Sequence, residues 1–263
     1  MTRWLMVLLA AAGMVRAETK LERGKRVVDE CLAALGGPRY LAMQNRIETG
    51  RAYSFYRERL QGLSVAKIYT RYSTVADTAH DLAVRERELF GKKLDYGYLY
   101  GESEAYDVTF RGARPLPAER FVRYKESTLR NIFYILRVRL REPGMVFESR
   151  GADVLDNRPV EIVDIGDADN RITTVYFDQT TKLPTRQLFT RRDPKTRETD
   201  EEVTLFSKYR EAAGVQWPLA IERRRNGEKI FEIFSESVEI NKDLHGDLFN
   251  LPTGTSILKS EER

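Results

Sequence analysis

The sequence contains one cysteine, Cys31, and two histidines, His80 and His245, among 263 residues. A single thiol cannot form an intrachain disulfide, and Cys31 falls in an apolar helical pattern that predicts a buried, inert side chain. No CxxC, HExxH or GxSxG motif is present, so the sequence provides neither a zinc site nor a hydrolytic triad. We therefore predict a protein with no enzymatic activity, no metal and no cofactor.

An excess of one charge is also missing. The formal net charge is +4, from 44 Lys and Arg against 40 Asp and Glu, and the two signs alternate along the chain. This distribution predicts a solvated surface and no nucleic-acid partner. The basic run 223–225 borders a predicted turn, where it is either a solvated strand end or a contact for anionic lipid or an acidic partner.

A long hydrophobic run is lacking as well. The first segment, MTRWLMVLLAAAGMVRA, has a basic residue, an apolar stretch from Trp4 to Val15, and a small residue on each side of Arg16. The stretch is shorter than the roughly 20 residues of a membrane-spanning helix. It predicts a secretory signal peptide covering residues 1–17, with an uncleaved membrane anchor as the alternative. We expect an exported, soluble protein of residues 18–263, folded as one domain.

Hydrophobic residues make up 41% of the chain, which is enough for a large core. Their spacing follows a helical period in some segments of the chain and alternates in others. Apolar residues three and four apart predict helices over 20–35 and 117–141, and alternation predicts strands over most of the rest. The first two strands are expected to meet near Gln61-Gly62, and Tyr96, Tyr98 and Tyr100 to share one face of a strand.

Turn signals separate the later strands at regular intervals. Asp156-Asn157, the segment 166–170, the segment 178–182 and Asn226-Gly227 each lie between runs of β-branched and aromatic residues. Pro184 and Pro218 cannot donate a ladder hydrogen bond, so we expect them at strand ends, bulges or edges. The pattern predicts an α+β fold, mainly antiparallel: a half-open curved sheet, or incomplete barrel, wrapped around a few helices.

Acidic clusters offer weak alternatives. The segment DIGDADN contains Asp164, Asp167 and Asp169, but it lacks the distant Glu of a calcium loop and stands where a hairpin turn is expected. Both histidines are flanked by turn residues and are expected in loops. A hydrolase that works through scattered carboxylates is the least favoured hypothesis.

Three segments resemble the LolA/LolB-like class of outer-membrane lipoprotein-sorting and carrier proteins. The chain has the D-x-x-T-x-L-P turn, then Y-x-x-x-x-G-V-x-x-P, and finally N-x-x-L-x-x-x-L-F-x-x-P. The matching positions are Asp178, Thr181, Leu183, Pro184; Tyr209, Gly214, Val215, Pro218; Asn241, Leu244, Leu248, Phe249 and Pro252. The opening VVDECLAALGGPRYLAMQNRIETG also looks like this class.

The resemblance implies a periplasmic half-barrel with an apolar cavity between sheet and helix that holds acyl chains of a lipid or lipoprotein. We predict that the cavity is lined by Phe121, Leu129, Ile132, Phe133, Leu136, Tyr98 and Tyr176. The leading hypothesis is a carrier or chaperone for a lipid or a lipid-modified protein, in which envelope membrane proteins are further candidate partners. The alternative is a non-enzymatic envelope module that senses or scaffolds through its surface and has a filled interior.

Overall fold

The computed structural model describes residues 17–192 and 197–259. The predicted signal peptide lies outside this part of the chain except for Ala17. The helical elements are α1 (Lys20–Ala34), α2 (Pro38–Leu41), α3 (Ala118–Leu129), α4 (Ile132–Tyr134), the π-helical turn η1 (Ile135–Arg139) and the 3-10 turn η2 (Gly246–Phe249). The strands are β1 (Asn45–Tyr56), β2 (Arg59–Tyr72), β3 (Val84–Phe90), β4 (Tyr96–Tyr100), β5 (Ala105–Thr109), β6 (Gly112–Pro115), β7 (Val146–Leu155), β8 (Arg158–Gly166), β9 (Ile172–Asp178), β10 (Pro184–Arg192), β11 (Thr199–Ala212), β12 (Val215–Arg225) and β13 (Glu228–Ile240).

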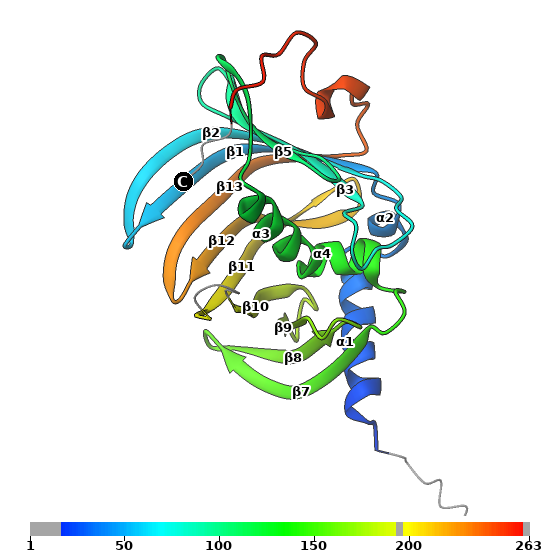
Figure 1. Cartoon of the computed structure of the whole chain (residues 1–263). Helices are drawn as coiled ribbons and strands as arrows, with labels where there is room; N and C mark the ends of the chain where they lie inside the picture. The colour runs from blue at the N-terminus through cyan, green and yellow to red at the C-terminus, as the bar shows by residue number, and fades with distance from the viewer. Residues whose placement is uncertain (1–16, 193–196, 260–263) are drawn as a thin grey trace, which may run out of the picture.

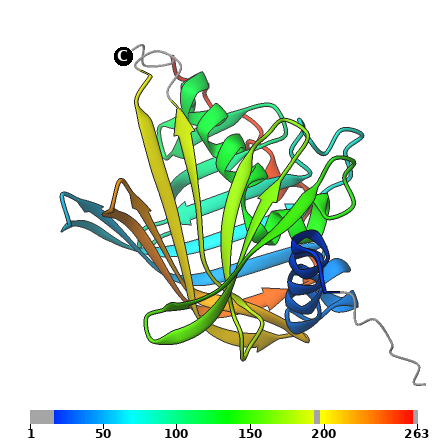
Figure 2. The same cartoon turned by 90° about the horizontal axis from the view of Figure 1, so that it is seen from below.

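All of these strands belong to one antiparallel sheet. Its 13 strands follow the order β6-β5-β4-β3-β2-β1-β13-β12-β11-β10-β9-β8-β7, so β6 and β7 are its two ends and the described strands do not close into a barrel. The sheet curves strongly, and α3 and α4 lie on its concave side (Figures 1 and 2). The predicted fold class, a half-open sheet around a few helices, is confirmed.

Helix α1 begins at a capping box. The Thr19 side chain accepts a hydrogen bond from the Glu22 amide, and the Glu22 carboxylate accepts one from the Thr19 amide. The buried face of the helix packs mainly on β7, where Gly24 approaches the carbonyl oxygen of Phe147 so closely that a Cβ atom would overlap it. Cys31 is buried on the same helix, and this burial raises the pKa of its thiol.

The largest core cluster joins α1, α4 and η1 to the concave face of the sheet. Phe133 of α4 packs its ring against Phe206 of β11, with 5.0 Å between centroids, and against Trp217 of β12, with 4.7 Å. The hydroxyl of Tyr40 donates a 2.6 Å hydrogen bond to the Phe133 carbonyl. This contact satisfies a backbone acceptor in the core and fixes α4 against α2.

The hairpin between β9 and β10 shows how one predicted turn forms. Asp178 Oδ1 accepts hydrogen bonds from the Thr180 amide at 2.9 Å and the Thr181 amide at 2.7 Å, and Lys182 adopts a positive φ of 62°. The Tyr209 hydroxyl then donates to the Pro184 carbonyl at 2.6 Å. The turn residues shared with the lipoprotein-sorting class therefore hold strands together, and the predicted hairpin is confirmed.

Both prolines lie where a ladder hydrogen bond is not required. Pro184 begins β10 beside a register irregularity. Pro218 is opposite Tyr209 of β11, but the pairing of β12 with β13 starts only at Ala220. Each proline therefore meets the expectation for its position.

The prediction of one helix over 117–141 is wrong. The chain leaves the α-helix after Leu129 and starts again at Ile132, because Asn131 adopts an extended conformation and its side chain accepts hydrogen bonds from the Phe133 and Tyr134 amides. An asparagine that caps a new helical turn inside an apolar stripe is a start signal that periodicity alone does not reveal.

The predicted turn at Gln61-Gly62 is also wrong. The chain reverses at Arg57 and Glu58, which both have positive φ, and Gly62 is already within β2 opposite Ser54. The register shifts next to this pair, between Ser54 and Phe55. Gly62 thus marks an irregularity in the strand pair, which is the other common role of glycine in a strand.

Candidate functional site

Four of the predicted cavity residues form solid core. Leu129, Ile132, Phe133 and Leu136 are almost fully buried; Ile132 is 0% exposed and Phe133 is 4% exposed. The Ile132 amide donates a 2.9 Å hydrogen bond to the side chain of Gln187 on β10, which further fixes this segment to the sheet. Because these side chains already fill the space next to α4, they leave no accessible surface for a ligand.

Tyr176 lies on the other face of the sheet. Its neighbour Val175 packs in the core with α4, and successive residues of a strand point to opposite faces. The Arg186 guanidinium, directly across on β10, stacks over the Tyr176 ring on the convex side, 5.4 Å from its centroid. The fold therefore separates Tyr176 from the other six residues.

The remaining two, Tyr98 and Phe121, are half-buried where α3 meets β4. Here α3 is attached by aromatic and polar contacts: the Tyr124 ring stacks on Tyr100 with 3.9 Å between centroids, and the Tyr124 hydroxyl donates to Glu86 at 2.7 Å. Phe121 stacks on Tyr124 at 6.4 Å. These contacts hold one side of α3 to β3 and β4.

The other side of α3 reaches β11. The Ser127 hydroxyl donates to Glu202 at 3.3 Å, and Glu202 in turn lies 3.8 Å from Arg191 and 3.9 Å from Arg225. In the strand order, β2, β1, β13 and β12 lie between β3 and β11. Helix α3 therefore bridges the concave face, and the middle strands of the sheet run beneath it (Figures 1 and 2).

An apolar cluster occupies these middle strands. We call it the concave strip; it consists of buried Ala52, Ala66 and Ile233 with partly exposed Ile68, Phe90, Ile221 and Phe231. Directly opposite residues of antiparallel strands point to the same face, and Ile221 lies opposite Phe206, whose ring contacts α4. The concave strip is thus on the helix side of the sheet.

The strip remains partly accessible despite the helix above it. Four of its large side chains are only half-buried, and Arg223, opposite Phe231, is exposed. Such a surface is the kind of apolar wall that a ligand can complete. Sequence reasoning missed these residues. Their alternation in β2, β3, β12 and β13 is visible in the chain, but alternation does not say which face becomes concave.

Two carboxylates lie opposite Ile68 of the strip, Glu48 on β1 and Glu88 on β3. Glu88 lies opposite Ile68 on β2 and Tyr98 on β4. Burial, reinforced by the neighbouring Glu86 carboxylate, raises the pKa of Glu88 to about 8, against the opposing pull of Arg223 and Arg120. This shift favours the neutral form of Glu88 and so reduces the negative charge at the margin of the strip.

A second polar system lies deeper on the concave side. The Arg46 guanidinium lies 3.8 Å from the Trp217 ring centroid and donates to Glu48 at 2.7 Å and to Thr70 at 3.1 Å. Ser235 donates to the other oxygen of Glu48 at 3.0 Å. The Arg46 and Glu48 charges are thus paired, whereas Arg46 Nη1 and the Trp217 indole nitrogen are buried without a hydrogen-bond partner among the described residues.

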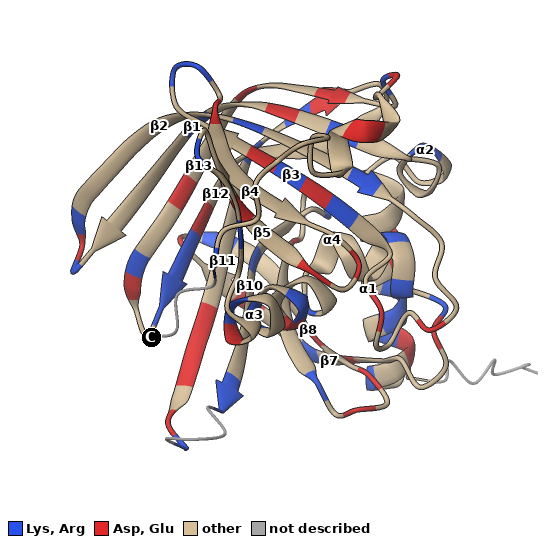
Figure 3. Ribbon diagram, turned by 45° about the horizontal axis from the view of Figure 1, so that its top comes forward, with Lys and Arg blue, Asp and Glu red and all other residues tan. Residues whose placement is uncertain are grey.

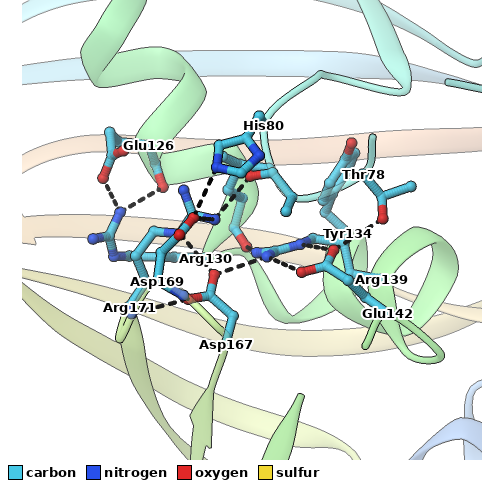
Figure 4. Close-up of polar contacts among 12 residues, drawn as sticks. Thr78, His80, Glu126, Arg130, Tyr134, Arg139, Glu142, Asp167, Asp169 and Arg171 are labelled. Atoms are coloured by element: carbon cyan, nitrogen blue, oxygen red, sulfur yellow. Dashed lines mark hydrogen bonds and ion pairs between the residues drawn. The ribbon is translucent and has the colours of Figure 1, made fainter. Parts of the chain in front are cut away.

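The densest polar cluster in the described residues joins three segments distant in sequence (Figure 4). Arg139 of η1 donates to Glu142 at 2.7 and 2.8 Å and to Asp167 at 2.8 Å, and Asp167 also accepts from Arg171 at 2.6 Å. Burial alone would raise the pKa of Asp167, but its hydrogen bonds from the two arginines lower it to about 2. The cluster locks η1 to the turn between β8 and β9.

His80 lies at the exposed margin of this cluster, in a loop as predicted. Its Nδ1 is 2.8 Å from Asp77 and its Nε2 is 3.1 Å from Asp169. The hydrogen bond with Asp77, and then the charges of both carboxylates, raise the pKa of His80. A histidine with a carboxylate beside each ring nitrogen suits an ion pair better than a general base.

The segment 166–170 forms the expected turn, with the Asn170 amide donating to the Asp167 carbonyl at 3.0 Å. Within the described ranges, no group of three or more His, Cys, Asp or Glu side chains is arranged to hold a metal ion. A narrow gap lies beside the cluster, between Leu129, Met145 and Ile165, and it has no room for a water molecule.

None of the helices formed by residues 17–192 and 197–259 combines the length and apolar character needed to cross a bilayer.

Comparisons with known proteins support the fold. No family model matches the chain, and no curated protein matches it in sequence. Among solved structures, a DUF1329 family protein from Desulfovibrio piger is similar with a TM-score of 0.59 and 13% identity, over 88% of this chain and 97% of that one. A domain from Vibrio parahaemolyticus, assigned to outer-membrane lipoprotein sorting, has a TM-score of 0.56 and 10% identity, over 88% and 97%.

A LolA superfamily protein from Nitrosomonas europaea is similar with a TM-score of 0.50 and 7% identity, over 86% of this chain and 96% of that one. The resemblance to the LolA/LolB-like class, first noted in three sequence segments, is therefore confirmed at the level of the fold. Identities this low describe shape, and the function must be argued from the residues of the concave side.

Proposed function

We propose that this protein is a periplasmic carrier or chaperone that binds a lipid, or the acyl chains of a lipid-modified protein, on the concave strip beneath α3. The observation that carries the proposal is the strip itself: apolar side chains that stay partly accessible on the inner face of a half-open sheet. The structural similarity to a lipoprotein-sorting domain and to a LolA superfamily protein is consistent with it. In this proposal residues 1–17 direct export and residues 18–263 act as one soluble domain without enzymatic activity.

The proposed site differs from the sequence-based one. Ligand contacts would come from Ile68, Phe90, Ile221 and Phe231, with Tyr98 and Phe121 at the margin. Each methylene that such a surface removes from water contributes about 0.8 kcal/mol, so one acyl chain supplies useful affinity without any hydrogen bond. The raised pKa of Glu88 favours its neutral form, which lessens repulsion of an anionic headgroup.

The test compares two phenylalanines on one strand. Phe231 faces the strip, whereas Phe234 faces the convex side, where Lys208 stacks on it at 4.8 Å. We expect Phe231→Ser to weaken uptake of a fluorescent fatty acid about tenfold, because one buried aromatic ring contributes roughly 1.5–3 kcal/mol. Phe234→Ser should leave uptake unchanged. Equal uptake by both folded variants would remove the strip from the site.

A second candidate is a non-enzymatic envelope module that acts through its surface. The filled core around Ile132 and Phe133 favours it, because a sensing or scaffolding domain requires no interior space. It predicts that one protein partner is recovered stoichiometrically from the envelope and that no lipid accompanies it. Fatty-acid uptake that depends on Phe231 would argue against this candidate.

A further inference from the structure

Three turns at one end of the strands are rich in basic residues. Because the strands from β1 to β6 form an antiparallel meander, the β1–β2, β3–β4 and β5–β6 turns lie at the same end of these strands. The Gly91 amide of the β3–β4 turn donates to the Val65 carbonyl of β2 at 3.0 Å, so this turn lies against β2, short of the β1–β2 turn at Arg57 and Glu58. We call this the basic edge; its exposed cations are Arg57, Arg59, Lys92, Lys93 and Arg111.

The charges of the basic edge are not neutralised by the protein. None of these five side chains forms an ion pair with a described residue, in contrast to Arg46, Arg191 and Arg224 on the same sheet. Glu58 and Asp95 are the acids within the same turns. The connections at the other end of the same strands carry acidic residues: the β4–β5 turn contains Glu102 and Glu104, and the β2–β3 loop contains Asp77 and Asp81. Lysines, arginines and acids are coloured in Figure 3.

Large apolar side chains project from the same turns. Leu60 is 55% exposed, Leu63 is 57% exposed, and Phe110, at the tip of the β5–β6 turn, is 83% exposed. Arg57 lies over the ring of Tyr56 and Arg111 over the ring of Phe110, each 5.3 Å from the centroid. Cationic and apolar surfaces are therefore adjacent at both tips.

The β1–β2 hairpin extends beyond β3, while β13 flanks β1 as far as Ser54. Strand β3 pairs with β2 only as far as Ala66, so residues 59–65 extend beyond it by roughly 20 Å at about 3.3 Å per residue. Figure 1 shows the hairpin as the long projection next to β13. A projecting hairpin can enter a flat surface that the curved body of the sheet cannot approach.

We propose that the basic edge docks the protein on an anionic lipid bilayer, with Leu60, Leu63 and Phe110 entering the interface and the five cations meeting lipid phosphates. The combination selects a bilayer over a soluble polyanion, because a polyanion would leave the exposed apolar side chains without a partner. It also selects an anionic over a neutral bilayer, because each Lys or Arg near an anionic surface strengthens binding.

Docking at this edge would place a membrane beside the open end of the concave strip. Phe231 lies opposite Ser54, three residues before the β1–β2 turn begins. An acyl chain could then pass between bilayer and strip over a short path. This consequence rests on the proposed carrier function, but docking itself does not.

The experiment is sedimentation of the exported protein with vesicles of phosphatidylcholine, with or without phosphatidylglycerol. We expect binding only to the anionic vesicles, and weaker binding at high salt. The pair Arg57→Ser and Arg59→Ser should lower the partition constant about 30-fold, because two charges at roughly 1 kcal/mol each are lost. The pair Leu60→Ser and Leu63→Ser should lower it at least tenfold, since two exposed aliphatic side chains no longer enter the interface.

A matched control comes from another hairpin. Val154 and Arg158, at the end of the β7–β8 pair, are also exposed, and Arg158 forms no ion pair with a described residue. Val154→Ser with Arg158→Ser therefore removes the same kinds of group elsewhere. This control should bind anionic vesicles like the unmodified protein. Equal binding to neutral vesicles, an equal loss in the control, or full competition by heparin with no effect of the leucine variants would overturn the proposal. Fatty-acid uptake, measured separately in detergent-free solution, reports on the carrier function and can fail independently.

Discussion

Replacing Arg139 with methionine tests the buried cluster that holds η1 to the sheet. Arg139 is 1% exposed and donates hydrogen bonds to Glu142, to Asp167 and, at 2.7 Å, to the Leu129 carbonyl. Methionine fills much of the same volume but carries no charge. Asp167 keeps Arg171 as a partner, whereas Glu142 keeps only the Thr78 hydroxyl at 2.9 Å. Breaking a buried pair from one side costs about 3–5 kcal/mol, and we expect the lower end of this range because Asp167 stays paired.

The assay is urea unfolding followed by tryptophan fluorescence, with two control variants. Arg171→Met should cost about 1 kcal/mol, because Asp167 retains Arg139 and the Arg171 side chain is partly exposed. Adding Glu142→Leu to Arg139→Met should recover part of the loss, since the unpaired carboxylate is then gone. A loss below about 1 kcal/mol for Arg139→Met would refute the assigned role of the cluster.

The same cluster predicts an acid limit. The pKa of Asp167 is lowered from 3.8 to about 2, so its ionised form stabilises the folded state above the unfolded-state pKa. This stabilisation is lost as the pH falls from about 4 to about 2. In the Arg139→Met protein the pKa of Asp167 should rise, and the acid-dependent loss of stability in that interval should be smaller.

Two further changes report on the concave side and on α1. The raised pKa of Glu88 means that the folded state binds a proton at this carboxyl more tightly than the unfolded chain does, so stability falls as the pH rises from 4.5 through about 8. Glu88→Gln should flatten this dependence of stability on pH, measured by urea unfolding. An unchanged pH dependence in the variant would contradict the burial of that carboxyl. Gly24→Ala places a methyl group against the Phe147 carbonyl and should lower the free energy of unfolding by at least about 2 kcal/mol. Alanine ordinarily stabilises a helix relative to glycine, so a raised melting temperature in thermal unfolding would contradict this close contact.

The strand meander could be predicted because each of its turns is determined by the residues within the turn. Asn226 and Gly227 both adopt the positive φ that a tight hairpin requires, and Asp178 caps its own turn through side-chain hydrogen bonds. The break at Asn131 was missed because its capping bonds to Phe133 and Tyr134 depend on one conformation among several open to asparagine. Local sequence signals predict the presence of a helix or strand more reliably than they predict its boundaries.

The candidate site was harder to predict because it depends on contacts between distant residues. A helical stripe containing Ile132 and Phe133 indicates burial, but a filled core and a ligand wall have the same apolar pattern. Arg139 looks like a solvated helix residue until the fold brings Asp167, 28 positions away, to its guanidinium. The curvature of the sheet decides which alternating face of β12 and β13 lies beneath α3, and no single strand encodes that curvature.

The central claim is that the concave strip holds a lipid or acyl chain. Native mass spectrometry of the protein, exported and purified without detergent, tests it most directly when the bound material is then extracted and identified. We predict a reproducible additional mass of lipid size that decreases in Phe231→Ser and persists in Phe234→Ser. A ligand-free mass, obtained after brief purification that preserves lipid on a known carrier treated in parallel, would contradict the claim and favour the surface-acting module.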